Sequence, residues 1–106
     1  MSSNSIQKLN DLFRKTSTTD IFFTASLAHL KLRSRLSILQ KVRDFSYFSS
    51  SNDPNGEHDF GLFVVDGETY IWKIDYYDAS LSYRSEDPSD ATRTRRILTI
   101  MHTTDY

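Results

Sequence analysis

Cysteine is absent from the 106-residue chain, and glycine, proline and long apolar runs are scarce. Without cysteine, no disulfide framework, thiol nucleophile or thiolate metal site can form, and the absence fits a reducing compartment. The three glycines provide no glycine-rich loop that would cradle a phosphate. No apolar stretch approaches the roughly 20 residues that span a bilayer, and the first residues lack the basic-then-apolar pattern of a secretory signal. We therefore expect a cytoplasmic protein without a membrane partner.

A strong charge of either sign is also missing, because 13 basic residues face 14 acidic ones and the net charge is −1. Proteins that bind nucleic acid through its phosphates usually carry a clear basic excess, so nucleic acid is not expected as the main partner. Aromatic residues, in contrast, make up 13% of the chain. Such a content is typical of a globular protein rather than a disordered tail, and the length predicts a single domain over residues 1–106.

Two segments, residues 5–14 and 34–48, have hydrophobic side chains at helical spacing. In the second segment an apolar residue recurs every three positions, at Leu36, Leu39, Val42 and Phe45, and Ile38 widens this stripe. Ser5 and Ser34 stand where an N-cap is expected. The sequence therefore predicts two amphipathic helices, each with one face directed at a core.

Four further segments are rich in strand-forming residues, and they lie near residues 21–24, 59–65, 68–75 and 96–102. Between the two central segments, Asp66-Gly67 is a strong signal for a two-residue hairpin turn. That turn pairs Val65 with Glu68 and, if the ladder continues, His58 with Asp75. Both faces of the hairpin are apolar in the middle, so we expect it to be covered on both sides. The predicted fold class is α+β: two helices packed on a small, mainly antiparallel sheet with a central β-hairpin.

The predicted hairpin register brings together a group of residues that can carry chemistry. His58 and Asp75 become cross-strand neighbours, with Glu57, Asp59 and Asp78 close by. A carboxylate beside a histidine orients the imidazole, as acid–base catalysis or metal binding requires. The candidate catalytic residues are therefore His58, Asp75 and Asp78. Glu57, His58 and Asp75 are the candidate ligands of Mg or Mn.

Two other interpretations of the same residues are open. The first, which we favour, is architectural: the His58–Asp75 pair locks the preceding loop onto the hairpin. The second is a binding surface, formed by residues with acidic or aromatic side chains: Glu57, Asp59, Tyr76, Tyr77 and Tyr83. The spacing matches no signature of a metallohydrolase. We therefore assign no catalytic residue from the sequence.

Several segments of the chain resemble one bacterial family. They are Asn-Asp-Pro-Asn-Gly-Glu-His-Asp-Phe-Gly at residues 52–61, Trp-Lys-Ile-Asp-Tyr-Tyr-Asp at 72–78, Ser-Glu-Asp-Pro-Ser-Asp at 85–90 and Arg-Ile-Leu-Thr-Ile-Met at 96–101. The family is an uncharacterised domain of unknown function that is met mostly in proteobacteria, often on plasmids and other mobile elements. The resemblance extends from about Ile6 to Tyr106 and includes the opening Leu9-Asn10-Asp11. It implies a setting on mobile DNA, but no activity, cofactor or catalytic residue.

Two functional hypotheses follow. The first is a small non-enzymatic interaction protein of a mobile genetic element, with a protein partner and no cofactor. Its most concrete form is an inhibitor of a host defence complex, either anti-restriction or anti-CRISPR. The alternative is a small hydrolase or nuclease that uses the His58/Asp75 cluster with Mg or Mn. A regulatory nucleic-acid-binding module is a third hypothesis, which the balanced charge disfavours.

Overall fold

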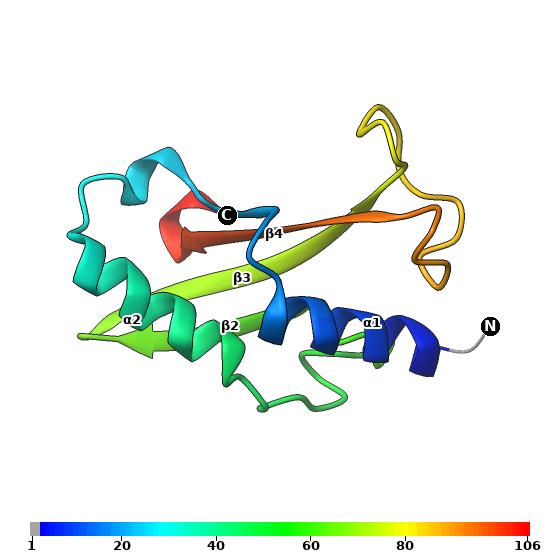
Figure 1. Ribbon diagram of the computed structural model, residues 1–106. Coiled ribbons are helices and arrows are strands. Elements are labelled where there is room, and N and C mark those ends of the chain that lie inside the picture. The colour runs from blue at the N-terminus through cyan, green and yellow to red at the C-terminus, as the bar shows by residue number, and fades with distance from the viewer. Residues whose placement is uncertain (1–2) are drawn as a thin grey trace.

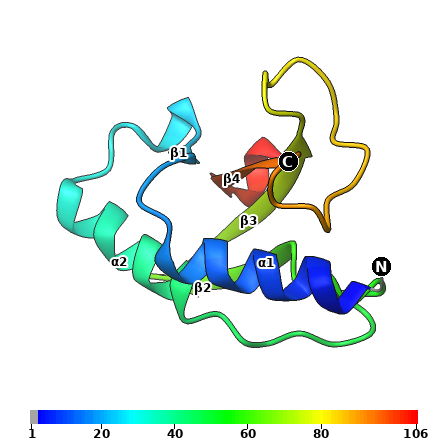
Figure 2. The same ribbon diagram turned by 45° about the vertical axis from the view of Figure 1, so that its right-hand side comes forward.

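A computed structural model describes residues 3–106, and within them two helices lie on one side of a four-stranded sheet (Figures 1 and 2). The elements in chain order are α1 (Ser3–Thr16), β1 (Ile21–Phe23), a 3-10 helix (Ala25–Leu27), α2 (Leu32–Arg43), β2 (Phe60–Val65), β3 (Glu68–Tyr77), β4 (Arg95–His102) and a second 3-10 helix (Thr103–Asp105). This arrangement confirms the predicted α+β class. Neither α-helix in the described range has the length and apolar character needed to cross a membrane.

The strands are ordered β1-β4-β3-β2, with β1 parallel to β4 and the other pairs antiparallel. The turn between β2 and β3 consists of Asp66 and Gly67, whose φ angles are 52° and 80°. Two successive residues with positive φ match the twist of a hairpin, and Asp-Gly supplies them at low cost. Val65 therefore pairs with Glu68, and the predicted register holds as far as Phe60 opposite Lys73.

The hydrophobic core lies between the helices and one face of the sheet. Trp72, Leu98 and Ile100 on the central strands are fully buried there. Gly61 on the neighbouring strand makes room for the indole, because a Cβ at this position would lie 2.8 Å from Trp72 Cε2 and 2.7 Å from Phe45 Cζ. Such distances are far below van der Waals contact, so the large aromatic residues of the core require glycine at this position.

Helix α2 differs from its prediction at both ends and on its buried face. It begins after Lys31 rather than at Ser34, and it ends at Arg43, so Phe45 belongs to the following loop. Ile38 and Val42 are buried, whereas Leu36 is 56% exposed. A repeat of three residues turns steadily around a helix with 3.6 residues per turn, so the predicted stripe could not stay on one face. Of the predicted stripe, Ile38, Val42 and Phe45 are buried, and only Leu36 is largely exposed.

The second face of the hairpin is more open than predicted. Ile71 is buried on this face, but Leu62 and Val64 on β2 are 49% and 59% exposed. The ring of Tyr106 packs 5.8 Å from that of Phe60, and the C-terminal 3-10 helix contacts β3. The described residues thus cover only part of this face, and the expectation of a sheet covered on both sides is wrong.

Candidate functional site

The predicted contact between His58 and Asp75 is wrong, because the pairing of β2 with β3 ends at Phe60 and Lys73, two positions before these residues. Its last hydrogen bond is donated by Ile74 N to Asp59 O over 2.8 Å. His58 then adopts a left-handed conformation with a φ of 56°, and its side chain no longer continues the strand. Asp75 accepts a 2.6 Å hydrogen bond from Lys73 Nζ instead.

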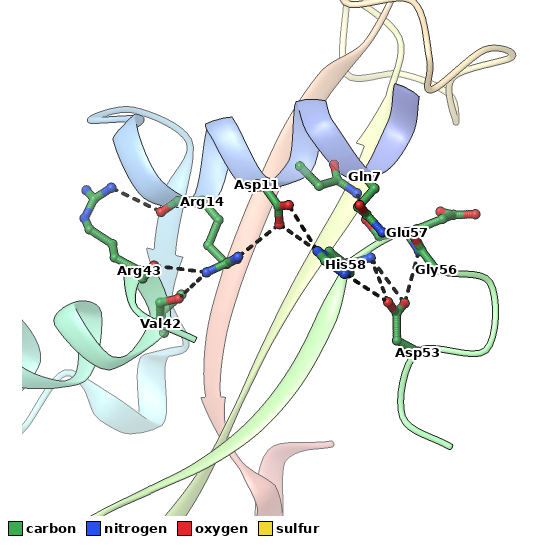
Figure 3. A network of polar contacts seen from close by, with 10 residues as sticks. Gln7, Asp11, Arg14, Val42, Arg43, Asp53, Gly56, Glu57 and His58 are labelled. Carbon is green, nitrogen blue, oxygen red and sulfur yellow. Dashed lines mark hydrogen bonds and ion pairs between the residues drawn. The ribbon is translucent and has the colours of Figure 1, made fainter. Parts of the chain in front are cut away.

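His58 meets two other carboxylates, both outside the sheet (Figure 3). Its Nδ1 lies 2.9 Å from Asp11 Oδ1, and its Nε2 lies 3.6 Å from Asp53 Oδ2. A carboxylate accepts hydrogen bonds, so the Nδ1–H group of His58 donates a hydrogen bond to Asp11. The imidazole also stacks on Phe48, with the ring centres 3.7 Å apart and the planes nearly parallel. His58 therefore connects helix α1, the loop and the aromatic core.

The loop before β2 is held by its own backbone and by helix α1. Asp53 Oδ1 accepts hydrogen bonds from the backbone N–H groups of Glu57 and His58 at 3.1 and 3.2 Å. Gly56 has a φ of 65°, and its carbonyl oxygen accepts a 2.8 Å hydrogen bond from Gln7 Nε2. The side chain of Asp53 thus closes the turn, and α1 fixes the turn in place. Figure 3 shows these contacts between α1 and the loop.

Asn10 is the centre of a second, buried set of hydrogen bonds. Its Nδ2 donates to Tyr76 Oη at 2.7 Å and to the carbonyl oxygen of Glu57 at 2.9 Å, while its Oδ1 accepts from Arg96 Nε at 2.6 Å. Tyr76 Oη in turn donates to Glu57 Oε1 at 2.8 Å. Burial, reinforced by the bond to Glu57, raises the pKa of Tyr76 and keeps the phenol protonated. Tyr76, a predicted surface residue, therefore belongs to the interior.

Two arginines complete the contact between the helices by capping each other's helix ends. Arg14 Nη1 donates to the carbonyl oxygens of Val42 and Arg43 at 2.9 and 3.1 Å, where α2 ends. Arg43 donates to the carbonyl oxygens of Arg14 and Ser17 at 3.2 and 2.8 Å, where α1 ends. The last carbonyls of a helix have no partner within it, and its C-terminus favours positive charge. This exchange gives terminal carbonyl groups of both helices a hydrogen-bond donor.

Burial lowers the pKa of Arg14, although its bond to Asp11 works in the opposite direction. The guanidinium lies 5.1 Å from the centre of the Trp72 ring and 3.0 Å from Asp11 Oδ1. Both contacts favour the charged form of Arg14. Asp11 thus joins a buried arginine to His58, and we call the whole set the polar clasp. Its members are Gln7, Asn10, Asp11 and Arg14 from α1, with Asp53, Glu57 and His58 from the loop.

The other predicted site residues lie apart from the clasp or on its border. Asp78 is at an exposed turn, where its Oδ1 accepts from Ser80 Oγ at 2.9 Å and from Ser82 N at 3.0 Å. Tyr83 is exposed and Tyr77 is half-buried at the end of β3. Among the described residues, no group of three or more His, Asp or Glu side chains is arranged to hold a metal ion. The structure does not bring Glu57, His58 and Asp75 together as a ligand set.

Sequence reasoning gave no role to the partners on α1. Gln7, Asn10, Asp11 and Arg14 follow the spacing of one helix face, which is normally apolar when a helix packs on a sheet. Polar residues at that spacing indicate a helix face that bonds to polar groups, and the loop-forming segment before β2 supplies such groups. This pattern could have indicated the contact. The apolar residues beside the polar ones, Leu9 and Phe13, concealed the pattern.

The fold and the clasp define a small α+β protein whose characteristic loop is locked to its first helix. A family model described as a protein of unknown function, DUF3768, matches residues 23–105, and the chain belongs to this family. The match covers the loop and β2 to β4, and it begins after α1, so the helical half of the clasp lies outside it. No match was found among curated proteins or among solved structures.

Proposed function

We propose that this protein is a small non-enzymatic interaction protein that acts in the cytoplasm by binding a protein partner. The observation that carries this proposal is the exposure of large hydrophobic side chains on α2 and β1. Leu32 and Leu36 on α2 are 64% and 56% exposed, and Phe22 on β1 is 53% exposed. Clustered exposed hydrophobic residues are typical of surfaces that another molecule covers.

The setting comes from the resemblance of the signature segments to a family met on plasmids and other mobile elements. A small interaction protein in that setting is most useful against the host systems that attack incoming DNA. We therefore propose inhibition of a host defence complex, by anti-restriction or anti-CRISPR action, as the specific form of the function.

The alternative, a metal-dependent hydrolase or nuclease, loses the geometry on which it was based. It required His58 beside Asp75, but His58 bonds to Asp11 and Asp75 bonds to Lys73. The imidazole Nδ1 and the buried clasp groups are engaged in holding the loop.

A phage-plating assay tests the proposed function. The chain is produced in bacterial hosts that carry either a restriction system or a CRISPR system, and each host is challenged with a phage that its system restricts. We expect plating to rise above that of the empty-vector control in at least one host. A double variant, Leu32→Glu with Leu36→Glu, should remove the rise at equal protein level. Unchanged plating in every host would reject the defence-inhibitor form of the proposal.

A further inference from the structure

A groove of about 510 Å³ runs between strand β1 and helix α2. Its walls are mostly apolar and include Phe22, Phe23, Ala28, Leu32, Leu36 and Leu39. On α2 the leucines stand at positions i, i+4 and i+7, which forms a ridge along one side of the helix. A ridge of this kind packs well against the side chains of a second helix.

The groove is held open by the chain itself. Arg35 Nη1 donates to the carbonyl oxygens of Ala28 and Leu30, which lie in the connection between the 3-10 helix and α2. These bonds fix the segment that forms one end of the groove. A partner would therefore enter a surface that already has its shape, which reduces the entropy lost on binding.

The segment that forms the groove is basic, although one carboxylate from elsewhere in the chain reaches its border, where Asp105 Oδ2 accepts a 3.1 Å hydrogen bond from Thr24 Oγ1. Residues 21–43 contain five Lys or Arg and no Asp or Glu, whereas the whole chain has a net charge of −1. Lys31 and Arg33 are exposed beside the groove, and neither forms an ion pair with a residue that the structure describes. A partner with acidic side chains flanking an apolar stripe would complement this surface.

We propose that the groove between β1 and α2 binds an acidic amphipathic helix of a protein partner. Its apolar stripe packs on Phe22, Leu32 and Leu36, and its carboxylates lie near Lys31 and Arg33. The proposal rests on the proposed function as an interaction protein and specifies the surface and the partner chemistry. A second copy of the chain fits less well, because pairing this basic surface with itself would bring like charges together.

The test is an NMR titration of the isotope-labelled full chain with synthetic peptides. The probe is an amphipathic helix of about four turns with a leucine stripe flanked by glutamates. A control peptide keeps the leucines and carries lysines in place of the glutamates, and a short DNA duplex is a second control. We expect the acidic peptide to shift backbone amide signals within residues 21–39, and to bind more weakly at high salt.

Three variants sharpen the result. Leu36→Glu should weaken binding of the acidic peptide about tenfold or more, and Arg33→Glu should weaken it by a smaller factor that vanishes at high salt. Leu12→Glu is the matched control, because Leu12 is an equally exposed leucine on α1, away from the groove. It should leave the affinity unchanged, and all three variants should keep the wild-type spectrum elsewhere.

Several outcomes would overturn the proposal. The first is that the acidic peptide does not bind at about 1 mM. The second is that the lysine peptide or the DNA binds equally well or more tightly. The third is that the peptide shifts signals of residues outside the groove. Self-association that protects the amides of α2, measured by ultracentrifugation and amide exchange, would make a second copy the occupant. Failure of the titration with a positive plating assay rejects the groove alone, and the reverse result rejects defence inhibition alone.

Discussion

The polar clasp and the groove between β1 and α2 differ in whether their side chains contact partners within the protein or solvent. In the clasp, Asn10, Asp11 and His58 bond to partners within the protein. In the groove, large hydrophobic side chains stay exposed and neighbouring basic residues have no carboxylate partner among the described residues. His58, a candidate catalytic residue from the sequence, thus stabilises the fold. The groove is the surface that keeps large hydrophobic side chains in contact with solvent.

The largest effect is expected from removing the centre of the clasp. Asn10→Ala removes one buried hydrogen bond each from Tyr76, Arg96 and the carbonyl oxygen of Glu57, and we expect a loss of about 3 kcal/mol of unfolding free energy. Urea denaturation followed by Trp72 fluorescence measures it. Asn55→Ala, at an exposed position of the same loop, should stay within about 0.5 kcal/mol of wild type. A loss below about 1 kcal/mol for Asn10→Ala would mean that the clasp contributes little.

A smaller loss is expected at His58. His58→Ala removes the bond to Asp11 and the stacking on Phe48, and it should cost about 1.5 kcal/mol. His29→Ala is the matched control, because His29 is exposed and its Nδ1 contacts the carbonyl oxygen of Ser26. Calorimetric melting of both variants checks the difference. Equal melting temperatures would contradict the structural role of His58.

Asp59, at the border of the clasp, should oppose folding at neutral pH. Burial, and then the charge of Glu57, raise the pKa of Asp59. The folded state binds the proton of Asp59 more tightly than the unfolded state does. This difference contributes stability fully below the unfolded-state pKa, and the contribution is lost as the pH rises through the folded-state pKa. Asp59→Asn should therefore melt higher than wild type at pH 7, and the difference should disappear in acid.

Asp20 is a control for that pH dependence, because its pKa is shifted in the opposite direction. The hydrogen bond from Arg95 lowers the pKa of Asp20, so its stabilisation exists above the unfolded pKa and is lost as the pH falls through the folded pKa. Asp20→Asn should melt lower than wild type at pH 7 and approach it in acid. Melting curves of both variants across the acid range would contradict the account if they shifted in the same direction.

The smallest effect on stability is expected in the groove. Leu36→Glu should change the unfolding free energy by no more than about 0.5 kcal/mol, because Leu36 is already largely in water. Ile38→Ala, two positions along the same helix, should cost roughly 3 kcal/mol because Ile38 is buried. Chemical denaturation of this pair compares the two sides of α2. A large loss for Leu36→Glu would show that the side chain supports the fold rather than a partner.

Local chemistry determined the parts of the fold that the sequence predicted. Asp66-Gly67 specifies a turn by itself, so the hairpin and its register followed from two residues. The end of α2 is capped by Arg14, whose guanidinium bonds to the carbonyl oxygen of Val42, 28 residues further along the chain. The conformation of His58 likewise depends on Asp11 and Asp53. The partners on α1 are distant in sequence from the loop and from the end of α2, so the local patterns at those two places did not indicate them, and the helix end and the candidate site were mispredicted.

The claim that the clasp is a structural lock is tested most directly by a double-mutant cycle between Asp11 and His58. The unfolding free energies of wild type, Asp11→Ala, His58→Ala and the double variant are measured at pH 7. Asp11 also bonds to Arg14, but that loss is common to both Asp11 variants and cancels in the cycle. We predict a coupling of about 1 kcal/mol between the two residues. If the losses of unfolding free energy in the two single variants added strictly in the double variant, the contact between Asp11 and His58 would not stabilise the fold, and the structural role of His58 would be contradicted.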